Sequence, residues 1–169
     1  MPPHAQAGSG AGRDGGRNRA APTLDYQELI DDHDRIDQLT HQLDRLIDSE
    51  HDRFAEADRL LAQLSATIVA HLAKEESFIY PDLARSTDPA DAIGLIIEFE
   101  ILKKDWTDFL GIWARPDRPA DWASFRRDTG GMLERLRLRV MKETSLLYAM
   151  ALREGLIRLR PPPDPAAGR

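Results

Sequence analysis

The feature that most constrains this chain is a helical period in its apolar residues, which recurs in four separate segments. Side chains three and four residues apart lie on one face of an α-helix, so each segment predicts a helix with one apolar stripe. The segments run over residues 25–49, 53–84, 88–113 and 121–154. Alternating β-branched runs and hairpin dipeptides are missing from the sequence, so the pattern predicts an all-α fold.

Residues at the segment ends predict where the helices begin and end. Asp25, followed three residues later by Glu28, is typical of a capping box, and Asp88 before Pro89 is typical of a helix start. Gly155 is a candidate for the left-handed residue after the last helix. Long helices joined by short loops favour an up-down-up-down antiparallel four-helix bundle.

Composition divides the chain into a bundle and two tails. Residues 1–22 form a Gly/Ala/Arg-rich segment with too few apolar side chains to offset the entropy of ordering, so we expect a disordered tail. The bundle is expected over residues 23–155. Residues 156–169 are expected to form a Pro-rich C-terminal tail.

Charge and residue usage exclude several classes of function. The formal net charge is −6, from 23 basic and 29 acidic residues, which argues against a nucleic-acid partner because phosphate backbones select basic surfaces. The chain has no cysteine, which excludes disulfides and thiolate metal sites. The chain has neither an apolar run long enough to span a membrane nor a signal peptide, so we expect a cytoplasmic protein without a membrane partner.

Five ionisable residues interrupt the apolar stripes, at positions where the helical period calls for an apolar side chain. Burying an ionised group costs several kcal/mol unless it is paired or bound to a metal. These residues come from three of the four predicted helices and lie at similar depths in the bundle, which indicates one shared polar site in the core. They are His33, His71, Glu75, Arg139 and Glu143.

The spacing of His71 and Glu75 is that of two metal ligands on one helix. Four residues apart, they lie one turn apart on one face, and an imidazole with a carboxylate suits iron, zinc or manganese. A lone His-x-x-x-Glu is more often a surface pair, but this one lies within an apolar stripe. Asp37, one turn after His33, is a candidate to orient an imidazole, although an exposed acid explains it more simply.

An internal repeat relates the second and fourth helices. Residues 71–80 align without gaps on residues 139–148, with Lys, Glu, Ser and Tyr coinciding, so that Tyr80 and Tyr148 are equivalent. The repeat predicts two helical hairpins related by a pseudo-twofold axis. Such an axis places the ligands of the two halves on opposite sides of one cavity, which is the geometry of a two-metal site. The equivalent positions of the two tyrosines are explained as well by packing in the core as by hydrogen bonds to the site.

The motifs resemble those of the hemerythrin-like family of HHE cation-binding domains, over about residues 25–152. Residues 31–36, Asp-Asp-His-Asp-Arg-Ile, resemble the motif of its first helix, and residues 71–81, His-Leu-Ala-Lys-Glu-Glu-Ser-Phe-Ile-Tyr-Pro, that of its second. The resemblance implies a four-helix bundle in which one histidine from each helix and two bridging carboxylates hold two non-haem irons. Functions in the family include oxygen carriage, iron or redox sensing, and the handling of nitric oxide or peroxide.

The second half of the chain departs from the family pattern. Phe99 stands where the resemblance implies a histidine on the third helix, and Arg139 where it implies one on the fourth. The metal ligands that remain are His33, His71, Glu75 and Glu143. We hypothesise that the permanent charge of Arg139 replaces the second metal as counter-ion and that Phe99 fills the remaining volume.

Two interpretations of this site stay open, and they lead to different functions. The residues hold at most one metal, either a non-haem iron or another divalent ion, or they form a buried salt-bridge network without metal. The first favours metal, redox or small-gas sensing or regulation rather than oxygen transport; the second favours a metal-free regulatory or interaction module. A weak redox enzyme acting on peroxide or nitric oxide is a further alternative. No nucleophile, base and acid group together in the sequence, which favours a non-catalytic role, and no motif indicates a protein partner.

Overall fold

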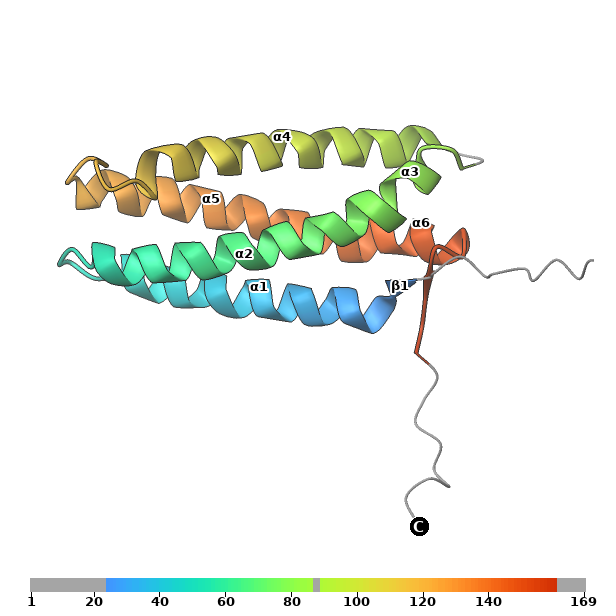
Figure 1. Cartoon of the computed structure of the whole chain (residues 1–169), viewed down its shortest axis with the longest axis horizontal. Coiled ribbons are helices and arrows are strands. Elements are labelled where there is room, and N and C mark those ends of the chain that lie inside the picture. The colour runs from blue at the N-terminus through green and yellow to red at the C-terminus, as the bar shows by residue number, and fades with distance from the viewer. Residues whose placement is uncertain (1–23, 87–88, 161–169) are drawn as a thin grey trace, which may run out of the picture.

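The computed structural model describes residues 24–86 and 89–160. Over these residues the chain is an antiparallel four-helix bundle, which confirms the predicted all-α, up-down-up-down fold (Figure 1). The first three rods are α1 (Tyr26–Ile47), α2 (Phe54–Phe78) with the short α3 (Tyr80–Leu83), and α4 (Pro89–Trp113). The fourth rod consists of α5 (Trp122–Lys142), the π-helical turn η1 (Glu143–Leu147) and α6 (Tyr148–Arg153).

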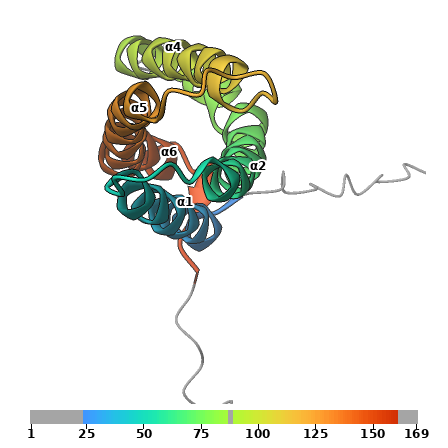
Figure 2. The ribbon, with the colours of Figure 1, turned by 90° about the vertical axis from the view of Figure 1, so that its left-hand side faces the viewer.

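Figure 2 shows the four rods end-on, arranged around a common axis. Helix α1 packs against α2 and α5, and α4 packs against α5. The apolar side chains form two clusters along the bundle axis. One cluster includes Leu43, Leu64 and Trp106, while the other, near β1, includes Leu29 and Phe99. The stripes of the amphipathic helices therefore face inward, as their spacing predicts.

The predicted helix ends are largely those of the structure. The Asp25 carboxylate caps α1 by accepting a hydrogen bond of 2.9 Å from the Gln27 backbone N–H, although Glu28 pairs with Lys74 instead of closing the capping box. Gly155 has a φ of +71° in the left-handed region, as expected. The predicted start of the third helix at Asp88 lies outside the described residues, as does the predicted tail over residues 1–22.

The single helix predicted over residues 53–84 is interrupted near its end. Helix α2 ends at Phe78, and Ile79 has φ −114° and ψ −58°. Pro81 accounts for the break because it lacks the N–H that would continue the helical ladder. Phe78 follows His71 by seven residues, a spacing that predicts the same inner face for both in an unbroken helix. The break leaves Phe78 38% exposed, and Ile79 is buried instead.

The fourth rod contains a π-helical turn that the helical period does not predict. Leu146 follows Glu143 by three residues, a spacing that predicts the same inner face for both in a regular α-helix. Leu146 is instead 48% exposed, while Leu147 and Tyr148 are fully buried. The π turn accommodates one residue more than an α turn, so the inward positions after Glu143 move by one residue.

Residues 156–160, assigned to the C-terminal tail on the sequence, contact the bundle in the structure. Strand β2 (Ile157–Arg158) pairs in parallel with β1 (Leu24–Asp25). Ile157 is only 2% exposed, and Arg160 forms an ion pair of 2.7 Å with Asp25. Burial of one branched side chain and this ion pair hold the segment against the start of α1.

Candidate metal centre

The five residues that interrupt the apolar stripes meet at one place in the core. Each is buried, and together they form a polar layer between the two apolar clusters. This group, called the polar cluster below, consists of His33 on α1, His71 and Glu75 on α2, Arg139 on α5 and Glu143 on η1. The five residues thus lie at one height along the bundle axis, as their positions in the sequence predict.

The two imidazoles are oriented by partners on their outer nitrogens. His71 Nδ1 lies 3.3 Å from Asp32 Oδ2, and because a carboxylate only accepts, Nδ1 is the donor. His33 Nδ1 lies 3.1 Å from Thr144 Oγ1. Both Nε2 atoms therefore point into the cluster, where they are 3.2 Å apart. An outer partner on each histidine is the usual support for an imidazole metal ligand.

Glu143 completes a compact group of three candidate ligands. Its Oε2 lies 3.0 Å from His33 Nε2 and 3.6 Å from His71 Nε2. One ligand atom from each of these residues lies within 4.8 Å of the other two, which is close enough for one metal ion. Two imidazoles and one carboxylate are donors that iron, zinc and manganese accept.

Glu75, the fourth ligand expected from the resemblance, lies beside this group and is engaged elsewhere. Its Oε1 is 3.6 Å from His71 Nε2 and accepts a hydrogen bond of 3.0 Å from the Tyr148 hydroxyl. Its Oε2 accepts from the Tyr80 hydroxyl at 2.7 Å and from Arg139 Nη2 at 3.0 Å. The carboxylate is thus fixed by two phenols and a guanidinium.

Arg139 joins both buried carboxylates. Its Nε donates to Glu143 Oε1 while its Nη2 donates to Glu75 Oε2. Its Nη1 donates to the backbone oxygen of Phe99 at 3.3 Å, and the guanidinium carbon lies 4.6 Å from the centre of the Phe99 ring. A fixed cation therefore stands between the two carboxylates, and it bonds to the oxygen of Glu143 that does not face His33.

The π turn brings Tyr148 into the cluster, a contribution that the sequence left undecided. The Tyr148 backbone N–H bonds to the Glu143 carbonyl, five residues earlier. Five residues of α-helix would turn Tyr148 about 140° away from Glu143. With the π turn, its hydroxyl lies 3.1 Å from His33 Nε2 and 3.5 Å from His71 Nε2. The only sequence signal was the shared spacing of glutamate and tyrosine in the two repeats.

Burial and neighbouring charges shift the pKa values of the cluster in opposite directions. Burial and the charge of Glu143 raise the pKa of Glu75 to about 7. Burial also opposes ionisation of Glu143, but hydrogen bonds from both histidines and the charge of Arg139 lower its pKa. Burial alone would lower the pKa of His71, yet hydrogen bonds to Asp32 and Glu143 raise it to about 9. Without a metal ion, Arg139 and protonated His71 are the cations that face the two carboxylates.

Asp37 does not orient an imidazole of the polar cluster. It lies 3.3 Å from His41, and both side chains are more than half exposed. Asp32, a residue that the sequence did not single out, takes the expected role instead. The four-residue spacing favoured Asp37 because it lies on the same helix as His33. The pair found in the structure, Asp32 with His71, joins α1 to α2.

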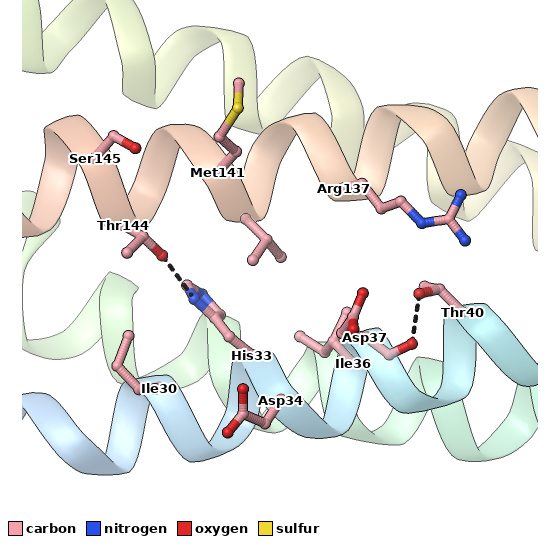
Figure 3. A pocket seen from close by; sticks show the side chains of 11 residues that line it. Ile30, His33, Asp34, Ile36, Asp37, Thr40, Arg137, Met141, Thr144 and Ser145 are labelled. Atoms are coloured by element: carbon pink, nitrogen blue, oxygen red, sulfur yellow. Dashed lines mark hydrogen bonds between the residues drawn. The ribbon is translucent and has the colours of Figure 1, made fainter.

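A groove between α1 and the fourth rod reaches the edge of the polar cluster (Figure 3). It has a volume of about 440 Å³, and His33 and Thr144 line it, joined by their hydrogen bond. Asp34 and Asp37 line it from α1, and Arg137 from α5. The groove is the approach from the surface to His33.

The two-metal arrangement that the resemblance implies does not fit these residues. The resemblance implies histidines at the positions of Phe99 and Arg139, and the Arg139 guanidinium lies between the two carboxylates that would bridge two ions. One ion fits the group of His33, His71 and Glu143, because its donor atoms converge and both histidines have outer partners.

Comparison with known proteins identifies the family of the chain. No curated protein and no solved structure matches the sequence significantly. The sequence model of the family described as Hemerythrin HHE cation binding domain matches residues 24–151, which include the first three rods, the fourth rod up to Ala151 and the whole polar cluster. The chain belongs to the hemerythrin HHE cation-binding domain family.

Proposed function

We propose that the protein binds a single metal ion, an iron, through His33, His71 and Glu143, and that it serves in metal or redox sensing or in regulation. The observation that carries the proposal is the pair of Nε2 atoms 3.2 Å apart, with Glu143 Oε2 3.0 Å from one of them. Metal binding requires both imidazoles to be neutral. Their outer nitrogens face Asp32 and Thr144, so both Nε2 lone pairs then face one point, where a cation takes the place of the proton that His71 carries without metal.

Arg139 supports a limit of one ion. A second ion would have to displace a guanidinium that is bonded to Glu75, Glu143 and the Phe99 carbonyl. Bound iron would supply a one-electron redox centre in an otherwise apolar core. Oxygen carriage of the family type needs two irons that share the electrons, so a one-ion site favours sensing or regulation.

The groove beside His33 supports exchange between the site and the surface. Asp34 and Asp37 line it, and carboxylates at an opening raise the local concentration of cations. Thr144 lines the groove together with His33, and its hydroxyl is hydrogen-bonded to His33 Nδ1. A change at the metal would therefore reach η1 by two routes, directly through the ligand Glu143 and through the hydrogen bond between His33 and Thr144.

The experiment that tests the proposal is a metal titration of the wild type and His33→Ala, with His41→Ala as matched control. His41 lies on the same helix, but its side chain is 58% exposed and paired with Asp37. We expect the wild type and His41→Ala to bind one equivalent of Fe²⁺ and His33→Ala to bind at least tenfold more weakly. Equal affinities for all three proteins would contradict the assignment.

A metal-free regulatory or interaction module is the second candidate, and hydrogen-bond satisfaction favours it. Three buried polar side-chain atoms of the described residues have no hydrogen-bond partner, and none of them belongs to the polar cluster. A proton shared between the histidines would satisfy the cluster as an ion does. Arg139→His separates the candidates, because restoring a family ligand raises the metal content of a metal-binding protein only.

A further inference from the structure

We propose that Tyr148 is also a ligand of the metal, through its phenolate oxygen, so that His33, His71, Glu143 and Tyr148 form one four-donor site. The inference rests on the proposed function, because it assigns a further donor to the same ion. It gives the buried hydroxyl of Tyr148 a role that the family resemblance did not assign to it.

The distances between the donor atoms carry the inference. Around a four-coordinate ion with bonds of about 2.0–2.1 Å, neighbouring donors lie about 3.3–3.4 Å apart. Tyr148 Oη lies 3.1 Å from His33 Nε2 and 3.5 Å from His71 Nε2. The three distances among the histidine nitrogens and Glu143 Oε2 are 3.0, 3.2 and 3.6 Å. Toward both histidine nitrogens, the hydroxyl oxygen thus has the spacing of a further donor to the same ion.

The packing of the ring holds this oxygen in place. Tyr148 is fully buried, and its ring stacks on His33 with an interplanar angle of 14° and centres 5.3 Å apart. The ring of Tyr26 packs edge-on against the ring of Tyr148, with ring centres 6.1 Å apart. The π turn fixes the backbone behind it. A rigid donor costs little entropy when it binds an ion.

The phenol proton has an acceptor already in position. As the metal–oxygen bond forms, the O–H bond breaks and the proton passes to Glu75 Oε1, which accepts the Tyr148 hydrogen bond at 3.0 Å. The other oxygen of Glu75 stays bonded to Tyr80 and Arg139. The site would then present two imidazoles and two anionic oxygens, a donor set that favours ferric over ferrous iron.

Visible spectroscopy tests the assignment, because a ferric ion bound to a phenolate gives a charge-transfer band that imidazole and carboxylate ligands do not give. Ferric nitrilotriacetate is added to the wild type, Tyr148→Phe and the control Tyr26→Phe, and bound iron is measured after gel filtration. Tyr26 contacts the Tyr148 ring but belongs to no part of the donor set. Circular dichroism and the melting temperature check that each variant is folded.

We expect the band in the wild type and in Tyr26→Phe and its complete loss in Tyr148→Phe, which still carries iron on the remaining ligands. Iron in the wild type without a band, or a band that persists in Tyr148→Phe, overturns the role of Tyr148 and leaves the metal site standing. A wild type that carries no iron overturns both proposals.

Discussion

At the scale of single residues, Arg139 supplies the permanent positive charge that faces two buried carboxylates. Its side chain is 8% exposed, and those of Glu75 and Glu143 are at most 1% exposed, so water screens these charges little. The guanidinium bonds to both carboxylates and to a backbone carbonyl. The interior of the bundle depends on this charge whether or not an ion is bound nearby.

We therefore predict that Arg139→Met destabilises the metal-free protein by about 3–5 kcal/mol, because it leaves buried carboxylates unpaired. The control is Arg135→Met on the same helix, which removes an ion pair with Asp105 whose partners are 45% and 36% exposed. This second change should cost at most about 1 kcal/mol. Urea denaturation measures the free energy of unfolding of both variants. Equal losses would show that the buried ion pairs of Arg139 stabilise the protein no more than the exposed ion pair of Arg135.

At the scale of the secondary-structure elements, η1 determines which side chains of the fourth rod face the core. The turn contains one residue more than an α turn, and Ser145 within it is exposed. Removing one residue there restores an α-helical turn and keeps Tyr148 on the side of Glu143. Removing a residue from regular α-helix instead rotates everything after it by about 100°.

Deletion of Ser145 should accordingly leave a folded bundle, whereas deletion of Glu134, an exposed residue of α5, should disrupt it. The second deletion turns Arg139 and Glu143 away from the cluster, while the first leaves their register intact. Thermal melting followed by circular dichroism compares the two. If both deletions lower the melting temperature equally, the register argument is wrong.

The helices and their inner faces could be predicted from the sequence because they depend on local spacing. The polar cluster could be predicted for the same reason, since each member replaces an apolar residue of a stripe. The π turn could not, because nothing in the residues Glu-Thr-Ser-Leu-Leu marks it. The hydrogen bond from the Tyr148 N–H to the Glu143 carbonyl and the burial of Leu147 are visible only in the structure. The roles of Tyr148 and Thr144 depend on that turn, and the role of Asp32 on the pairing of two helices, so none follows from spacing alone. Metal binding by the predicted ligands stays a prediction.

At the scale of the whole molecule, the described chain is closed at one end by the pairing of β1 with β2. This parallel pair joins the segment that precedes α1 to the segment that follows α6. Ile157 packs into the apolar cluster that includes Leu29 and Phe99. The sequence gives this segment the appearance of a tail because prolines follow it directly. One buried isoleucine is enough to make it part of the core.

Ile157→Ala should lower the free energy of unfolding by about 2–5 kcal/mol, the range for truncating a buried isoleucine. Leu159→Ala, two residues later, removes a side chain that is 65% exposed and should change stability by at most about 0.5 kcal/mol. Chemical denaturation of the two variants compares positions in the same short segment. Similar small effects for both would place residues 156–160 outside the cooperative fold.

The number of metal ions per chain tests the central claim most directly. Elemental analysis of protein loaded with iron and freed of loosely bound ions gives this number without any assumption about the role of the protein. Because Arg139 lies between Glu75 and Glu143, we predict one tightly bound ion per chain. Two ions per chain would contradict the replacement of a metal by Arg139, and no bound ion would contradict the metal site itself.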